Sequence, residues 1–95
     1  MRPALLSPDE VVAALSALPA WQQSGVTITR TYTGDSFMAV IAWVVAIADA
    51  AERLDHHPDL DIRWTSLQVT LSTHDRGGLT SLDFTLAAQI DAICR

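Results

Sequence analysis

Lysine and asparagine are both missing from the 95-residue sequence, and all six basic residues are arginines. Without lysine, the chain cannot form a Schiff base with a carbonyl substrate and cannot supply the phosphate-binding lysine of a P-loop. G-x-S-x-G, C-x-x-C and G-x-G-x-x-G motifs are missing too. The sequence therefore lacks the usual signatures of serine hydrolases, dithiol redox enzymes and dinucleotide-binding enzymes.

Cysteine is nearly absent, since Cys94 is the single one in the chain. One cysteine cannot form a disulfide within the chain. The first residues also lack a charged region followed by an apolar one, which is the pattern of a secretory signal. We therefore expect the protein to act in the cytoplasm.

Positive charge is limited, because the net charge is −5 at pH 7 and the pI is near 4.8. Binding to nucleic acid or to an anionic membrane rests on clustered positive charge, so we expect neither partner. Long apolar runs are missing as well. The run from Phe37 to Ala48 is far shorter than the roughly 20 residues that span a bilayer, which predicts a buried helix instead.

The length predicts a single domain over residues 1–95, near the lower limit for a self-sufficient core. Hydrophobic residues make up 49% of the chain, which is high for so small a domain. Apolar surface left over after folding would be covered by another copy of the chain. We therefore expect a homo-oligomer.

The hydrophobic periodicity and the capping signals define the expected elements. Ser7, Pro8 and Glu10 combine a cap, a first-turn proline and a capping-box acid, and predict a helix from about Pro8 to Leu18. A period-two pattern predicts a strand over residues 26–33, which we expect to pair with residues near Trp21.

The second half of the chain repeats this order. A helix is expected from Ser36 to about Leu54, and a strand from about Trp64 to Thr73, with His74 in phase with the polar face. A glycine-containing turn and Thr80 then open a last helix. This order predicts an α+β domain with helices on one face of an antiparallel sheet.

Histidines are the main candidates for chemistry. His56 and His57 follow the second predicted helix and precede Pro58, and His74 ends a predicted strand. Glu52 lies four residues before His56, so its carboxylate is expected to face and orient that imidazole. Imidazoles near pKa 6.5 can donate or accept protons at neutral pH, which makes acid–base catalysis plausible.

Other interpretations of the same residues stay open at this point. The paired histidines could simply interact with the helix C-terminal dipole. A zinc site with three histidines is disfavoured, because adjacent residues diverge in direction and no H-x-H or H-x₃-H spacing occurs. Asp83 could be an ordinary capping-box acid. Trp21 lies two residues after Pro19 and is followed by polar residues, so it is the tryptophan best placed to stack on a ligand.

Residues 51–58 (AERLDHHP) and 71–75 (LSTHD), together with residues 78–80 and Asp83, resemble the pterin-4a-carbinolamine dehydratases. Weaker similarity extends back to Trp21. The resemblance implies removal of water from 4a-hydroxytetrahydropterin to give quinonoid dihydropterin, which serves tetrahydrobiopterin recycling without a metal or an organic cofactor. It also implies a four-stranded antiparallel sheet in the order α-β-β-α-β-β-α, assembled as a homodimer or homotetramer.

The resemblance also implies roles for individual residues. The catalytic group comprises His56, His57, His74 and Glu52. Within it His56 and His74 form the acid–base pair, His57 chiefly holds the pterin, and Glu52 orients His56. Four further residues match substrate-binding positions, namely Asp83, Trp21, Ser72 and Thr73. A non-catalytic binding or assembly module on the same fold is the alternative.

Two positions depart from the family's pattern. Leu60 stands where an aromatic residue is usual, and Trp64 stands where a tyrosine is usual. The walls of the pocket are therefore expected to differ from those of other members.

Overall fold

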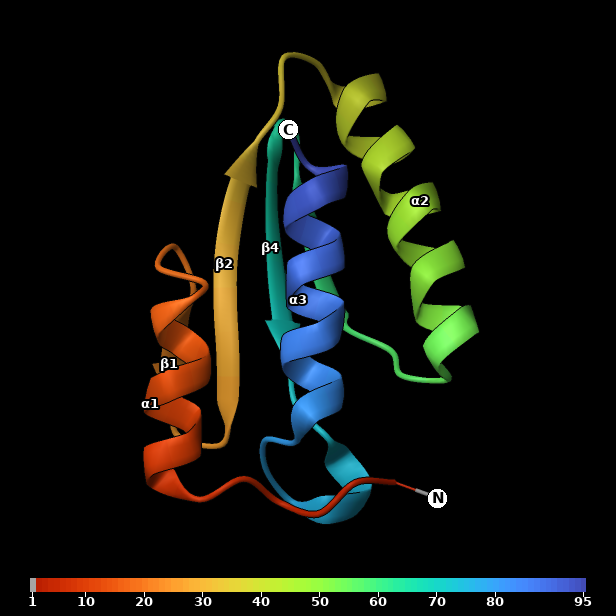
Figure 1. The fold of residues 1–95 in the computed structure, drawn as a ribbon. Helices are drawn as coiled ribbons and strands as arrows, with labels where there is room; N and C mark the ends of the chain where they lie inside the picture. The colour runs from red at the N-terminus through yellow and green to blue at the C-terminus, as the bar shows by residue number, and fades with distance from the viewer. Residues whose placement is uncertain (1) are drawn as a thin grey trace.

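The computed structural model describes residues 2–95. In chain order the elements are α1 (Pro8–Ser16), β1 (Gln22–Ser24), β2 (Thr27–Thr33), α2 (Phe37–Leu54), β3 (Asp59–Arg63), β4 (Ser66–Leu71), the short 3₁₀ helix η1 (His74–Arg76) and α3 (Ser81–Ile93). The four strands form one antiparallel sheet in the order β1-β2-β4-β3. The three α-helices lie on one face of it, with α3 between α1 and α2 (Figure 1). The predicted α+β class and element order are confirmed.

The core fills the space between this sheet and the helices. Alternate residues of the central strands point into it, including Ile28 and Tyr32 from β2 and Val69 from β4. Val40 and Ile47 of α2 meet them from the helical layer. The other face of the sheet carries the threonines and polar residues of the same strands, which explains the period-two pattern of the sequence.

Two predicted boundaries were wrong. α1 ends at Ser16 rather than Leu18, because Ala17 and Leu18 donate to carbonyls three residues back and tighten the last turn ahead of Pro19. The strand expected from Trp64 begins at Ser66 and ends at Leu71. Trp64 lies in the tight turn between β3 and β4, where its φ of 53° is left-handed.

One end of the molecule collects the segments that carry the histidines. The C-terminal end of α2, the segment after β4 with η1, and the start of α3 all lie at the lower end of Figure 1. The pairing of β4 between β2 and β3 directs its chain toward this end. No helix within residues 2–95 is both long and apolar enough to cross a membrane.

Candidate active site

The C-terminal end of α2 turns His56 into the protein. Asp55 takes a left-handed conformation with φ 48° and ψ 46°. The backbone N–H of His56 donates to the Ala51 carbonyl at 3.0 Å, and that of Asp55 donates to the Glu52 carbonyl at 3.2 Å. These two bonds form a Schellman motif, in which aspartate tolerates the left-handed position better than most residues do. The reversal leaves His56 only 4% exposed.

The N-terminus of α3 supplies the partner of His56. Thr80 is the N-cap, and its backbone N–H donates to Oδ2 of Asp83 at 2.9 Å, completing the capping box that the sequence indicated. Asp83 is fully buried. Nε2 of His56 lies 2.7 Å from Oδ1 of the same carboxylate. The capping acid and the histidine partner are therefore one residue.

A hydrogen-bond network surrounds the Asp83 carboxyl group. The Thr73 hydroxyl donates to Oδ2 of Asp83 at 2.9 Å, so its oxygen is left to accept from the Thr80 hydroxyl 2.8 Å away. The Thr80 hydroxyl in turn accepts from the Leu82 backbone N–H. When Asp83 is ionised, both of its oxygens accept hydrogen bonds, and Nε2 of His56 is then the donor to Oδ1.

The second ring nitrogen of His56, Nδ1, has no hydrogen-bond partner within residues 2–95. No fully buried side-chain nitrogen or oxygen of the described chain lacks a partner. Nδ1 therefore reaches solvent although the ring as a whole is buried. With Nε2 protonated, Nδ1 accepts a proton in the neutral ring and donates one in the imidazolium.

Glu52 contacts His57 instead of His56, so the expected partner was wrong. Its Oε2 lies 3.1 Å from Nε2 of His57, and both side chains are exposed. The left-handed turn at Asp55 explains the difference, because it breaks the helical spacing that would have placed His56 beside Glu52. Asp83 takes the orienting position that the sequence analysis gave to Glu52.

His74 begins η1 and is exposed, which confirms its predicted exposure, although the strand ends at Leu71 before it reaches His74. It directly follows Thr73, whose hydroxyl contacts Asp83, so the network joins the segments of His74 and His56. Ser72 is buried beside Thr73 instead of lying on the polar face. The chain leaves the sheet after Leu71, and the strand's alternation ends there.

Trp21 does not form an exposed wall beside the histidines in this chain. Its ring is buried, packs edge-on against Tyr32, and donates from Nε1 to Asp91 Oδ1 at 3.0 Å. Asp91 lies near the opposite end of α3 from Asp83 and also accepts from Arg30 and Tyr32. The sequence gave no signal for this cluster, because its members come from three separate segments, namely the residue before β1, β2 and α3.

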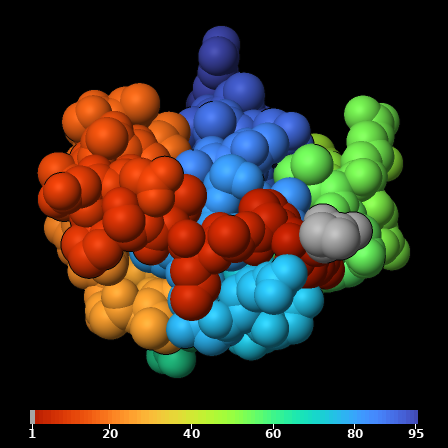
Figure 2. Space-filling view, turned by 60° about the horizontal axis from the view of Figure 1, so that its bottom comes forward, coloured from red at the N-terminus to blue at the C-terminus, as the bar shows by residue number. Residues whose placement is uncertain are grey.

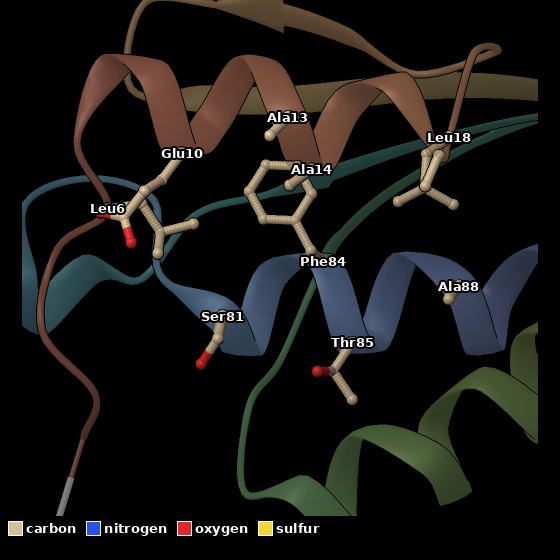
Figure 3. Close-up of a pocket in the computed structure, with 10 residues that line it drawn as sticks. Leu6, Glu10, Ala13, Ala14, Leu18, Ser81, Phe84, Thr85 and Ala88 are labelled. Carbon is tan, nitrogen blue, oxygen red and sulfur yellow. The ribbon is translucent and has the colours of Figure 1, made fainter.

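A groove of about 640 Å³ between α1 and α3 contains none of the histidines. Figure 3 shows the Phe84 ring of α3 pointing toward α1, beside Ala14, with Leu6 and Leu18 near the two ends. Its lining is mostly apolar and offers no imidazole for proton transfer. Within residues 2–95, no group of three or more His, Cys, Asp or Glu side chains is placed to hold a metal ion.

A sequence model described as pterin 4 alpha carbinolamine dehydratase matches residues 4–93. The chain belongs to this family. A relative from Nocardia farcinica, provisionally named a pterin-4-alpha-carbinolamine dehydratase, is 53% identical over 91 residues, which is 96% of each chain. A second, from Roseiflexus castenholzii and named in the same way, is 50% identical over 95% of this chain and 97% of its own.

Two solved structures share this fold. A transcriptional coactivator/pterin dehydratase from Brucella melitensis superposes with a TM-score of 0.91 at 35% identity, over 95% of this chain and 98% of its own. A pterin dehydratase-like protein described as a RuBisCO assembly factor in the alpha-carboxysome shares the fold, with a TM-score of 0.65 at 21% identity over 78% of this chain and 86% of its own. Pterin dehydratase-like folds thus occur in proteins described in different functional terms.

Proposed function

We propose that this protein dehydrates 4a-hydroxytetrahydropterin to quinonoid dihydropterin. The observation that carries the proposal is the buried His56–Asp83 pair, in which the carboxylate orients the ring and Nδ1 remains open. An acid that holds a histidine in one tautomer is a recurrent device of acid–base catalysis. Membership in the dehydratase family supplies the substrate class.

The reaction needs one acid and one base and no redox partner. The acid protonates the hydroxyl on the 4a carbon, the C–O bond breaks, and water leaves. The lone pair of the adjacent ring nitrogen forms the C=N bond, and the base takes that nitrogen's proton. One proton is given and one is taken, so the enzyme ends the cycle unchanged in total charge.

His56 and His74 are proposed as the acid–base pair. Thr73 supports this pairing, because it contacts Asp83 and directly precedes His74. His57 is proposed to hold the pterin at the surface, with Glu52 orienting its ring. Asp83 then replaces Glu52 as the residue that orients His56.

Dehydration of chemically generated carbinolamine tests the proposal. Purified protein is expected to accelerate water loss, and His56→Ala and His74→Ala each to lower kcat by about 10²–10⁴-fold, the usual contribution of a positioned acid or base. Arg63→Ala on the β3 edge strand is the control for a surface change remote from α2's end and η1. A wild type that does not accelerate the reaction would contradict the proposal.

The proposal also includes the setting of this activity. Recycling of tetrahydrobiopterin after aromatic hydroxylation is the process that would supply the carbinolamine. A cytoplasmic location is consistent with a single cysteine, which leaves no disulfide to form within the chain.

A second copy of the chain is the proposed partner, and the outer face of α2 is its proposed contact. Met38 and Val45 lie two helical turns apart on this face and are 73% and 66% exposed. Exposed apolar stripes of this kind are typical of interaction surfaces. The high apolar content of α2 is explained if one face packs on the core and the other on a second copy.

A non-catalytic assembly role is the second candidate, favoured by the shared fold with the RuBisCO assembly factor. That role does not need the buried His56–Asp83 pair to be intact. If wild-type protein and a His56→Ala/His74→Ala variant both lack dehydratase activity while folding and associating equally, this second candidate would be favoured.

A further inference from the structure

The N-terminal segment, residues 2–6, lies across the end of the molecule that carries the histidines. In Figure 2 its red surface meets the cyan surface around η1 and continues toward the green end of α2. The backbone N–H of Leu6 donates to the Leu79 carbonyl at 2.9 Å, and the Leu5 side chain packs closely against Gly78. The segment is therefore attached to the loop that leads into α3.

Arg2 lies between two acids that belong to different histidine segments. Its Nη2 is 3.8 Å from Oδ2 of Asp55, and its Nε is 3.5 Å from Oδ2 of Asp75. Its backbone carbonyl accepts from Nη2 of Arg76 at 3.0 Å. One guanidinium thus faces the end of α2 and η1 together, while the neighbouring peptide is bound to η1.

These two acids are the immediate neighbours of the proposed acid–base pair. Asp55 precedes His56, and Asp75 follows His74. We infer that Arg2 is a positioning residue, which sets the distance between His56 and His74 by binding the carboxylates next to them. This inference rests on the proposed dehydratase function and deepens it, because it adds a residue outside the matched stretch 4–93 to the catalytic arrangement.

The expected effect is on geometry rather than on stability. Asp55 and Asp75 are largely exposed, and exposed ion pairs contribute little to the free energy of unfolding. The covalent path between the two acids runs through the whole β3–β4 hairpin, whereas Arg2 joins them directly. η1 is a single 3₁₀ turn that is closed by its own backbone bonds, including those between Thr73 and Gly78 and from Gly77 to His74. Arg2 therefore acts on how this closed turn lies relative to the end of α2.

Steady-state kinetics on Arg2→Ala test this positioning. We expect kcat to fall by about 3- to 30-fold, with KM changed by less than about twofold, because small misplacements of reacting groups lower the rate more than they lower binding. Arg2→Lys is expected to recover part of the loss, since one ammonium cannot span both acids as the guanidinium does. Arg63→Ala is the matched control, because Arg63 also pairs with an exposed aspartate, Asp61 at 3.2 Å, but on the β3 edge strand.

A double-mutant cycle identifies the contact responsible. If Arg2 acts through Asp75, the combined Arg2→Ala/Asp75→Asn variant should lose less activity than the product of the two single losses. Equal kcat values for Arg2→Ala and Arg63→Ala would overturn the inference while leaving the dehydratase function intact, and so would fully independent losses in the cycle.

Amide hydrogen exchange separates this inference from the function on which it rests. If wild-type protein shows no dehydration, the proposed function fails. The bridging role of Arg2 is then tested by the rates of amide hydrogen exchange in residues 54–57 and 74–78. Faster exchange in both segments of Arg2→Ala than in Arg63→Ala would support the bridging role. Unchanged exchange in both segments would overturn it.

Discussion

Nε2 of His56 and Oδ1 of Asp83 lie 2.7 Å apart, although 27 residues of sequence separate the two side chains. The contact connects the end of α2 to the start of α3, and both side chains of the pair are buried. Because Asp83 also accepts from Thr73 and Thr80, the same side chain caps a helix and, when ionised, binds the Nε2 proton of a candidate catalytic histidine.

Asp83→Asn should separate activity from folding. The amide has a single acceptor oxygen, whereas His56, Thr73 and Thr80 all donate to the carboxylate. At least one donor would face an NH₂ group, which we expect to cost roughly 1–3 kcal/mol of stability. If the amide donates to His56, Nε2 becomes the acceptor and Nδ1 carries the proton, so kcat should fall by about 10²-fold or more. Urea denaturation and dehydration kinetics measure the two effects. Asp61→Asn on the β3 edge strand, with unchanged values, is the control.

Glu52→Gln should have a much milder effect than Asp83→Asn. The Glu52–His57 pair is exposed, and such pairs contribute about 0.2–1 kcal/mol, which corresponds to at most about fivefold in an equilibrium constant. We expect weaker pterin binding within that limit and little change in kcat or in stability. Fluorescence titration with a non-reacting pterin measures the affinity. A loss of kcat as large as that of Asp83→Asn would restore the role that the sequence analysis gave to Glu52.

Alkaline pH should destabilise the protein partly through Cys94. Burial, with a further contribution from the Asp91 carboxylate, raises the pKa of this thiol from 9.0 to about 11. The unfolded chain therefore loses the thiol proton at lower pH than the folded chain. The stability contribution is complete below pH 9 and is lost as the pH rises to about 11. Burial and the hydrogen bond to Asp91 raise the pKa of Tyr32 as well, which adds to the effect.

Urea unfolding of wild type and Cys94→Ala at about pH 8 and about pH 10.5 tests this linkage. The variant should lose less stability than wild type between the two conditions. An identical pH dependence in both proteins would show that Cys94 is not shielded from ionisation in the folded state.

Val45→Asp should weaken self-association. The substitution places a charge on the exposed apolar face of α2, where a second copy would have to remove it from water. Sedimentation velocity is expected to show the wild type as a dimer or tetramer and the variant as a smaller species with unchanged circular dichroism. A monomeric wild type would contradict the proposed contact. Gln68→Asp on the polar face of the sheet, which is exposed in the single chain, is the control.

The helices were largely predictable because their signals are local. Ser7 with Glu10 and Thr80 with Asp83 are capping boxes that the sequence displays within four residues, and both are present in the structure. The strand alternation around Ile28 and Val69 likewise shows which side chains enter the core. Local periodicity and caps were therefore sufficient for the fold class.

The partners of the site residues were less predictable because they depend on tertiary contacts. Glu52 was assigned to His56 by helical spacing, and the left-handed Asp55 ends that spacing one residue too early. Trp21 was judged by its polar neighbours in sequence, whereas Asp91, 70 residues away, holds its indole in the core. The catalytic roles of His56, His57 and His74 stay predictions.

The rate of carbinolamine dehydration by wild type and by the folded His56→Ala/His74→Ala variant tests the central claim most directly. The account predicts clear acceleration by wild type and a loss of about 10²-fold or more in the variant, with circular dichroism unchanged. Equal rates for the two proteins would contradict it.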